Sequence, residues 1–349
     1  MKILVITDLY PIKSNEIHTP KTIYDFVAGW RALGHDVKII KPNFLLNSAI
    51  RKKPFYRTGV YNDVENINYF LPFCGEIRKK IKTQLDADIV IAHMPCGIIF
   101  ANKLGLPFIA GVHVSDIEVL TNPIYHFYFK KEMEKAYKKA IKIACRSDNI
   151  KRKFLKIFPE YKNKTFVAFS GIDEELIIQK HWQNKDKYKI VTCANLIKRK
   201  NVDKVILACE NIENIDLTVI GSGKEYKNLK RISSKVNFTG QLDKTKVIEK
   251  MRESDIFILP SENETFGMVY LEAMASGCIT VGLKNDGIDG IIQHNVNGFL
   301  TDKNNIKSTI ENILKSNNNN EILKNSYETI KNYTISKACE NYLSNIKNN

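Results

Sequence analysis

The sequence contains no Cys-x-x-Cys pair, although seven cysteines occur along its 349 residues. Zinc fingers and disulfide-stapled folds need closely spaced cysteines, so neither is expected, and the scattered thiols are predicted to be free and buried. No apolar run approaches the roughly 20 residues that a membrane-spanning helix requires. The apolar stretch Met1–Ile6 is too short for the core of a signal peptide and is predicted to be a first buried strand. These absences predict a cytoplasmic protein.

An Asp-x-Asp pair in a setting that suggests metal binding is also missing, so neither a metal nor a cofactor is predicted. The glycine-rich turn after the apolar run Leu217–Ile220 stops at Gly223. It lacks the third glycine of a dinucleotide-binding fingerprint, and no acidic residue ends a following strand at the usual distance. NAD is therefore not expected.

Positive charge exceeds negative charge, and the excess is uneven along the chain. The net charge is +15, and residues 1–173 hold 28 Lys and Arg against 16 Asp and Glu. The remaining residues hold 25 against 22. The N-terminal half is therefore expected to face an anionic partner, whereas the C-terminal half needs only local charges for its ligand.

Short apolar strands alternate with helices in two successive sets. This order is typical of parallel, doubly wound α/β sheets, and the chain is too long for one compact core. The sequence predicts two facing Rossmann-like domains with a ligand cleft between them. Residues 1–173 form the first domain, residues 174–330 the second, and residues 331–349 a helix that packs back on the first. A long basic helix is expected at Lys130–Ile143.

The most informative stretch runs from Asp255 to Gly277. An apolar strand, Ile256–Leu259, is followed by a polar loop and by a helix that Gly277 terminates. The start of a helix directs free backbone N–H groups and a positive dipole end at the loop, which suits a phosphate or diphosphate. Glu264 and Glu272, with seven residues between them, add carboxylates that can accept hydrogen bonds from sugar hydroxyls.

A cationic loop, Lys198–Lys200, follows the first strand of the second domain and stands where a loop becomes a helix, a favourable place for a diphosphate. Together with the Glu-x7-Glu spacing and with Phe266-Gly267, it resembles the retaining glycosyltransferases of family 4, which have the GT-B fold. The likeness is strong over residues 190–300, fair over 88–116 and weak over 41–85.

The resemblance implies a donor site for a nucleoside-diphosphate sugar, with UDP favoured. It places Lys200 on the diphosphate, Glu264 on the hydroxyls of the donor sugar and Glu272 on the ribose. Asn195 stands where most of the family has an arginine, which leaves one phosphate contact fewer. The donor-binding residues that the resemblance implies are Asn195, Arg199, Lys200, Gly221, Thr239, Gly240, Glu264, Thr265, Phe266, Gly267, Met268 and Glu272.

In the first domain, the segment Gly111–Asp116 follows a strand, at the edge where open α/β sheets bind ligands. His113 resembles the histidine of the family's His-Gly-Ser-Asp motif and is implied to contact the transferred sugar. It joins Lys200 and Glu264 as the implied catalytic residues. His93 also matches a family position and is interpreted as support for this loop. Asn15–Pro20 lacks the glycine that the family has after its first strand.

Residues 130–156 contain 11 Lys and Arg against 3 Asp and Glu, and the aromatic run Tyr125–Phe129 precedes them. A second cluster, Arg51–Arg57, also mixes basic and aromatic residues. Such faces suit an anionic bilayer, and the alternative is a basic helix that only meets solvent. Enzymes of this family in bacterial envelope assembly favour a glycan or lipid-linked acceptor at the inner face of the cytoplasmic membrane. The residues expected to face the membrane or acceptor are Lys130, Lys131, Lys135, Lys138, Lys139 and Lys142.

The sequence thus predicts a metal-independent hexosyltransferase that moves a sugar to a hydroxyl acceptor with retention of configuration. One alternative is a nucleotide-sugar 2-epimerase of GT-B fold, which would need acid/base carboxylates in its first domain. The other is a non-enzymatic protein that binds anions or nucleic acid, which would leave the glutamate pair unused. No nucleic acid partner is therefore predicted.

Overall fold

The computed structural model describes residues 1–11, 21–44, 59–61, 63–69, 86–125 and 129–347. The chain divides into two compact units, of which unit 1 comprises Met1–Phe169 with Ala338–Asn349 and unit 2 comprises Ser170–Lys337. The boundaries predicted after residues 173 and 330 differ from this division. Ile172 shows the reason, because its backbone pairs with Tyr333 and Ile335 near the end of unit 2.

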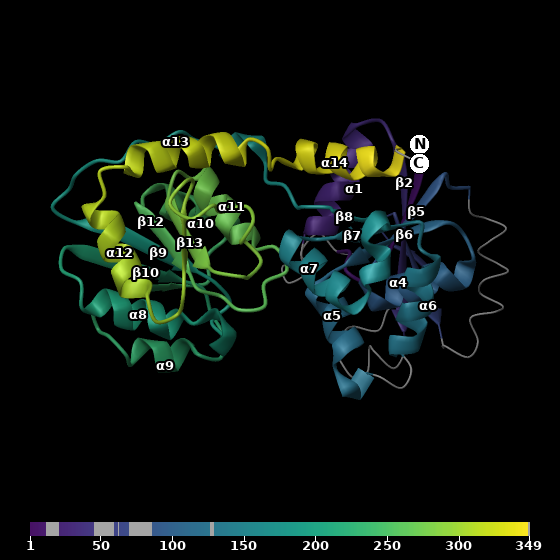
Figure 1. Cartoon of the computed structure of the whole chain (residues 1–349), viewed down its shortest axis with the longest axis horizontal. Helices are drawn as coiled ribbons and strands as arrows, with labels where there is room; N and C mark the ends of the chain where they lie inside the picture. Colours follow the sequence, from purple (N-terminus) through teal and green to yellow (C-terminus); the bar gives the residue numbers. More distant parts are fainter. Residues whose placement is uncertain (12–20, 45–58, 62, 70–85, 126–128, 348–349) are drawn as a thin grey trace. The chain divides into compact units, whose positions relative to one another are not determined.

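Unit 1 is built on a sheet of eight strands in the order β3-β4-β2-β1-β5-β6-β7-β8. Figure 1 labels β2, β5, β6, β7 and β8 of this sheet. All described pairings are parallel except that of β3 with β4. Central strands such as β5 and β6 are buried on both faces, as parallel sheets covered by helices require. The strands are β1 (Lys2–Thr7), β2 (Asp36–Phe44), β3 (Gly59–Tyr61), β4 (Val64–Tyr69), β5 (Ile89–His93), β6 (Phe108–Val112), β7 (Lys142–Cys145) and β8 (Thr165–Val167).

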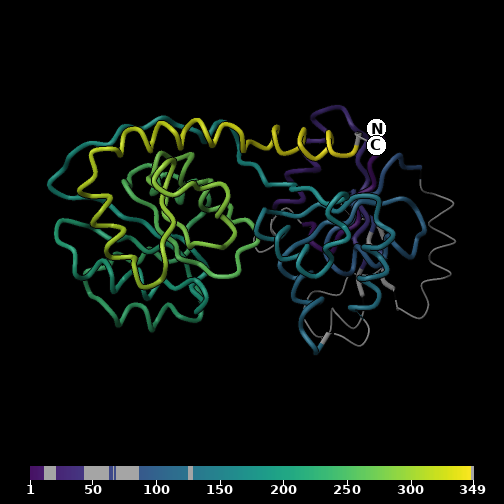
Figure 2. Tube along the Cα trace, viewed as in Figure 1, coloured from purple at the N-terminus to yellow at the C-terminus, as the bar shows by residue number. Residues whose placement is uncertain are grey.

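The described helices of unit 1 connect these strands, and the last helix of the chain returns to them. Tyr342 of that helix packs edge-on against Phe26 and Trp30, with ring centroids 5.4 and 5.3 Å away. The Cα trace in Figure 2 shows this yellow C-terminal segment beside the purple N-terminal one. The helices are α1 (Thr22–Ala32), α4 (Met94–Leu104), α5 (Val114–Thr121), α6 (Lys131–Lys139), α7 (Asp148–Ile157) and α14 (Ile335–Lys347).

The helix predicted over Lys130–Ile143 is wrong in its last four residues, because α6 ends at Lys139 and Lys142–Cys145 forms β7. Ala140 leaves the helical conformation with ψ 134°. The ammonium of Lys164 donates hydrogen bonds to the carbonyl oxygens of Tyr137 (2.6 Å) and Ala140 (3.0 Å). These carbonyls have no partner in the next turn of a helix, so Lys164 stabilises the end that the sequence pattern missed.

Unit 2 is a sheet of six parallel strands in the order β11-β10-β9-β12-β13-β14. Within this unit, α8 and α9 lie on one side of the sheet, and α11 and α13 lie on the other (Figure 1). The strands are β9 (Tyr188–Cys193), β10 (Ile215–Ile220), β11 (Asn237–Gly240), β12 (Ile256–Leu259), β13 (Ile279–Leu283) and β14 (Phe299–Thr301). The helices are α8 (Val202–Glu210), α9 (Tyr226–Lys230), α10 (Lys244–Arg252), α11 (Met268–Ala275), α12 (Ile306–Lys315) and α13 (Asn319–Ile330).

The described cysteines are all free, and all of them except the half-buried Cys193 are buried, as predicted. Cys74 lies outside the described residues. Within the described part of the chain, we find no helix with the length and apolarity needed to span a bilayer.

Candidate functional site

The order of the strands in unit 2 reverses between β9 and β12. From β9 the chain moves outward to β10 and β11, and it then returns to place β12 on the other side of β9. Ligands of open α/β sheets bind outside the carboxyl ends of the strands at such a reversal. Two predicted segments meet there, namely Lys198–Lys200 after β9 and Pro260–Glu264 after β12.

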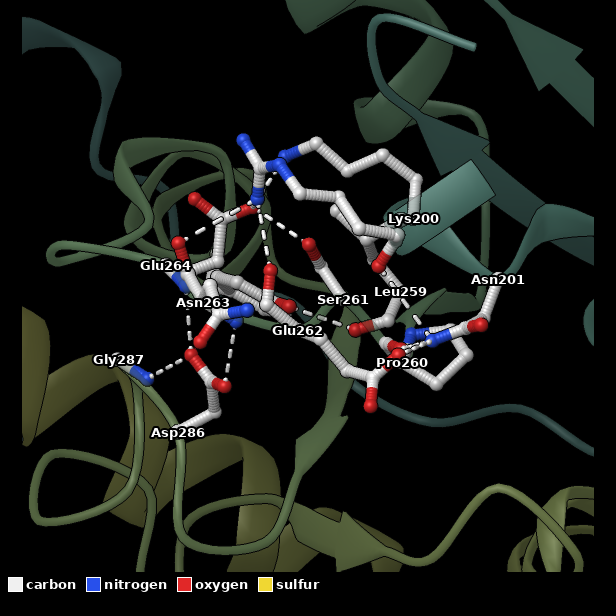
Figure 3. A network of polar contacts seen from close by, with 12 residues as sticks. Lys200, Asn201, Leu259, Pro260, Ser261, Glu262, Asn263, Glu264, Asp286 and Gly287 are labelled. Atoms are coloured by element: carbon white, nitrogen blue, oxygen red, sulfur yellow. Dashed lines mark hydrogen bonds and ion pairs between the residues drawn. The ribbon is translucent and has the colours of Figure 1, made fainter. Parts of the chain in front are cut away.

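An ion pair between the Lys200 ammonium and the Glu264 carboxylate joins these two segments (Figure 3). The two side chains are only 12% and 15% exposed. The hydroxyl of Ser261 donates to the same carboxylate oxygen at 2.6 Å, and the Arg199 guanidinium lies 3.6 Å from it. Burial would raise the pKa of Glu264, but the charge of Lys200 and these hydrogen bonds outweigh burial and hold the pKa below its ordinary value. Glu264 is therefore ionised at neutral pH.

Asp286 fixes the backbone that carries Glu264. Its carboxylate accepts hydrogen bonds from the backbone N–H groups of Asn263 (2.8 Å), Glu264 (2.7 Å) and Gly287 (2.7 Å), as Figure 3 shows. Gly287 packs so closely that a Cβ atom there would lie 2.8 Å from the Cβ of Glu264. Asn263 has a φ of 56°, a strained left-handed conformation that this network holds in place. The position of the Glu264 carboxylate is thus set by the loop and not by its own rotamer alone.

The cationic loop is tied to the β12 loop by two further side chains. Arg199 donates to the backbone carbonyl of Glu262 at 2.7 Å, and the amide of Asn201 donates to the carbonyl of Pro260 at 2.8 Å. Asn201, with a φ of 51°, ends the short Lys198–Lys200 turn and precedes α8. Arg199 therefore braces the loop as well as facing Glu264.

The helix α11 begins at the same edge of the sheet. Gly267, with a φ of 85°, precedes it and has no side chain that could cap the first N–H groups. A Cβ at Gly267 would lie 2.5 Å from the ring of Tyr270, whose hydroxyl donates to the carbonyl of Leu259 at 2.6 Å. The backbone of Phe266, Gly267 and Met268 therefore offers N–H groups and a positive dipole end to a ligand.

Glu272, one turn inside α11, forms an ion pair with Lys244 at the start of α10. The Glu272 side chain is 13% exposed and that of Lys244 is 56% exposed. Burial, followed by the charge of Glu272, raises the pKa of the Cys193 thiol at the end of β9 to about 12. Glu272 thus also faces the carboxyl end of the sheet, with a cation at its side.

Of the other predicted donor residues, Asn195 and Gly221 lie on the loops after β9 and β10, whereas Thr239 and Gly240 end β11. The N–H of Gly221 donates to the carbonyl of Gly240 at 2.8 Å, and the hydroxyl of Thr239 donates to the same carbonyl at 3.0 Å. At Gly221, with a φ of 131°, a Cβ would lie 1.9 Å from the carbonyl oxygen of Ala194. Asn195, which directly follows Ala194, is exposed. The structure therefore gathers the predicted residues of unit 2 along one edge of its sheet.

In unit 1, His113 follows β6 and precedes the first turn of α5. Its backbone N–H donates to Asp116 at 2.7 Å, and its Nε2 lies 3.2 Å from Nδ1 of the buried His93. Burial and, to a lesser degree, the charge of Arg146 lower the pKa of His113 to about 3. His113 is therefore neutral at physiological pH and can donate and accept hydrogen bonds.

The basic residues of unit 1 are divided between a helix and a strand. The helix α6 buries Met133 and Ala136 and exposes its lysines on the opposite side. Lys142, predicted on the helix, is instead half-buried in β7. Lys130 is half-buried, and Lys135 pairs with Glu132 at 2.8 Å. The exposed lysines of α6 are Lys131, Lys135, Lys138 and Lys139.

Several predicted features lie partly or wholly outside the described residues. These are the loop Asn15–Pro20, the cluster Arg51–Arg57 and the central part of the run Tyr125–Phe129. Phe129 itself is described and packs against the core of unit 1. The sequence contained no signal for Asp286, Ser261 or Lys244, whose partners are fixed only by tertiary structure.

Two models of glycosyltransferase families match this chain. Residues 20–176 match the family described as Glycosyltransferase Family 4, and residues 173–336 match the glycosyl transferases group 1. The chain is 28% identical over 336 residues to the uncharacterized glycosyltransferase MJ1178 of Methanocaldococcus jannaschii, covering 90% of this chain and 92% of that protein. It is 27% identical over 296 residues to N-acetyl-alpha-D-glucosaminyl L-malate synthase of Bacillus anthracis, covering 76% of each.

Among solved structures, Anabaena Alr3699/HepE in complex with UDP aligns with a TM-score of 0.72 at 16% identity, over 99% of this chain and 100% of that one. This likeness, with the two parallel sheets and their helices, confirms the predicted GT-B fold.

Proposed function

Because the chain belongs to the group 1 glycosyltransferases of family 4, we propose that it transfers a sugar from a UDP-sugar to a cell-envelope glycan or lipid-linked acceptor. Retention of the anomeric configuration and independence of metal ions are parts of this proposal. Glycosyltransferase activity itself follows from the family. The choice of UDP is supported by its presence in the structure of Alr3699/HepE.

The observation that carries the donor site is the Lys200–Glu264 pair beside the uncapped start of α11. In the proposed reaction, Lys200 and the N–H groups around Gly267 bind the diphosphate and stabilise the negative charge that develops as it leaves. Glu264 accepts hydrogen bonds from the hydroxyls of the transferred sugar. Binding of the diphosphate lets Lys200 exchange one anionic partner for another, so neither Lys200 nor the phosphate is left uncompensated.

Glu272 is proposed to accept hydrogen bonds from the ribose hydroxyls, with Lys244 as its partner in the free enzyme. The end of β11, with Thr239 and Gly240, is proposed to line the uracil base, largely through backbone groups. His113, which belongs to unit 1, is assigned to the transferred sugar from its family motif, and its neutral ring suits a hydrogen bond to a hydroxyl.

A panel of nucleotide sugars tests the donor. The protein should release UDP from one UDP-sugar in the presence of an envelope extract as acceptor. The anomeric proton of the product, observed by NMR, should have the configuration of the donor. Added EDTA should leave the rate unchanged, and complete loss of activity on chelation would contradict metal independence. A 2-epimerase would instead form a new UDP-sugar without any acceptor.

The exposed lysines of α6 support the membrane part of the proposal. Four cations on one helix face, each contributing about 1 kcal/mol near an anionic bilayer, give reversible and salt-sensitive binding. Ile124, between α5 and α6 in sequence, is 85% exposed and can add an apolar contact that salt does not weaken.

Co-sedimentation with anionic liposomes tests this surface. Lys131, Lys135, Lys138 and Lys139 changed together to Glu should release the protein from liposomes without altering UDP binding. The matched control makes the same charge change in unit 2, at Lys307, Lys315, Lys324 and Lys331, which are also exposed. The control should still bind. If the wild-type protein does not sediment even at low salt, the membrane proposal is wrong, and a soluble anionic acceptor would then account for the charge.

A further inference from the structure

We propose that His93 is a positioning residue for His113, whose ring it holds in one rotamer and one tautomer. The proposal builds on the assignment of His113 to the transferred sugar. His93 ends β5 and His113 follows β6, which is the neighbouring strand of the sheet. Two imidazoles are thus brought together at the carboxyl edge of unit 1 by strand pairing alone.

The geometry of the two rings is that of a hydrogen-bonded pair. Nδ1 of His93 lies 3.2 Å from Nε2 of His113, and the rings meet edge-on with centroids 5.3 Å apart. His93 is 1% exposed, so water does not compete for its Nδ1. The ring of Tyr342, from α14, packs edge-on on His93 with centroids 6.3 Å apart. The orientation of His93 is therefore determined by packing, and it can impose an orientation on His113.

The backbone around the pair is shaped to accommodate the ring of His93. Gly111 precedes His113 by two residues, and a Cβ there would lie 2.1 Å from Nδ1 of His93. Met94, directly after His93, has a φ of 66° although it is not a glycine. Such a conformation is unfavourable for a residue with a side chain and persists only where the surrounding structure enforces it. Both features place the ring of His93 where it meets His113.

The protonation states of the two histidines are compatible with a single hydrogen bond between their rings. Burial, followed by the charges of His113 and Arg146, lowers the pKa of His93 well below its ordinary value, and the pKa of His113 is lowered to about 3. Two neutral rings form one hydrogen bond, in which one nitrogen donates and the other accepts. Because Nε2 of His113 takes part, it carries the proton when Nδ1 of His93 accepts and lacks it when Nδ1 donates, so the tautomer of His93 sets that of His113. Asp116 and Tyr342 are the other titratable groups beside the pair.

Variants of His93 separate this role from simple packing. His93→Asn keeps a polar atom near the position of Nδ1, whereas His93→Leu has nearly the same shape and lacks it. We expect His93→Leu to lower kcat about tenfold or more, with little change in the KM for the UDP-sugar, and His93→Asn to restore part of kcat. Thermal unfolding should first show that both variants are folded. Equal kcat values for the Asn and Leu variants would then overturn the proposal.

Gly111→Ala provides an independent test, because its new Cβ displaces the ring of His93. Its effect on kcat should disappear when His93 is already Ala, since no ring remains to be displaced. Additive effects in the double variant would show that Gly111 acts by another route and would contradict the coupling.

The ¹⁵N chemical shifts of His113 give a readout that does not depend on activity. A His113→Asn variant identifies its signals. The wild-type protein should show one neutral tautomer, and His93→Leu should show a mixture of two. An unchanged tautomer in His93→Leu would refute the positioning role. If instead the tautomer changes but His113→Asn turns over at the wild-type rate, the assignment of His113 to the sugar is wrong while the contact stands.

Discussion

Replacing Lys200 by Met removes the cation of the Lys200–Glu264 pair and keeps most of its aliphatic stem. Glu264 then retains the Ser261 hydroxyl at 2.6 Å and the Arg199 guanidinium at 3.6 Å. Burial, which acts against the ionised carboxylate, meets less opposing charge. The pKa of Glu264 should therefore rise in Lys200→Met, and the free energy of unfolding at neutral pH should fall.

The size of the effect follows from the exposure of the pair. Removing one partner of a fully buried pair costs about 3–5 kcal/mol, whereas an exposed pair contributes about 1 kcal/mol or less. At 12% and 15% exposure, and with two partners left to Glu264, the expected loss lies between these limits, at about 2 kcal/mol. For a unit of this size the melting temperature should fall by about 4–8 °C.

The pKa of Glu264 determines how the loss of stability in Lys200→Met changes with pH. The pKa of Glu264 in the folded protein is held below its ordinary value of 4.5. The ionised carboxylate therefore stabilises the fold above pH 4.5, and this stabilisation is lost as the pH falls through the pKa of the folded protein. In Lys200→Met the carboxyl takes up its proton at a higher pH. The deficit in stability relative to the wild type should therefore be full at pH 7 and shrink towards pH 4.

The stability deficit can be measured by thermal and denaturant unfolding at pH 7 and pH 4.5. The proteins to compare are the wild type, Lys200→Met, Glu264→Gln and the double variant. The double variant should be more stable than the sum of the single losses implies, because removing both charges leaves none unpaired. A Lys200→Met protein as stable as the wild type at pH 7, or a deficit that does not change with pH, would refute the reasoning.

Three further predictions concern the donor side. Glu264→Gln should act mainly on turnover and Glu272→Gln mainly on UDP affinity, each by about ten- to a hundredfold for a lost charge-assisted hydrogen bond. Wild-type kinetics in both variants would contradict the assignment. Lys244→Met should leave the fold intact and change the affinity for UDP, measured by calorimetry, because Glu272 loses the cation with which it forms an ion pair. Gly287→Ala should displace Glu264 and lower turnover, since its Cβ would lie 2.8 Å from that residue's Cβ, and unchanged turnover would argue against the fixed loop.

Unit 2 could be predicted closely where local signals agree. The bounds of β12 coincide with those expected from the sequence, and α11 ends just before Gly277, as expected. Pro260 ends an apolar run, and glycine on each side of α11 limits a segment of good helix formers. In such segments the local signals already determine where each element begins and ends, so tertiary contacts do not shift these bounds.

The last four residues of the predicted helix Lys130–Ile143 were wrong because the sequence pattern there is ambiguous. Ile141–Cys145 is a short apolar run with β-branched residues, which suits a buried strand as well as a helix. The decision comes from partners distant in sequence, namely the parallel neighbours β6 and β8 and the Lys164 ammonium at the end of α6.

The main charged residues of the site could be predicted from the sequence, but the hydrogen bonds and ion pairs that position them could not. The Glu-x7-Glu spacing and the cationic loop indicated Glu264, Glu272 and Lys200. The roles of Asp286 and Lys244 depend on contacts across loops that are joined only when the sheet forms. Neither residue belongs to a recognisable motif, so sequence reasoning had no means of finding them.

Hydrogen–deuterium exchange with and without UDP tests the central claim most directly. If unit 2 binds the donor at the reversal between β9 and β12, UDP should slow exchange in peptides that contain residues 194–200 and 261–268. Peptides of α12 and α13 should exchange as before. Turnover of a UDP-sugar without protection of either loop, or protection confined to other parts of the chain, would contradict the account.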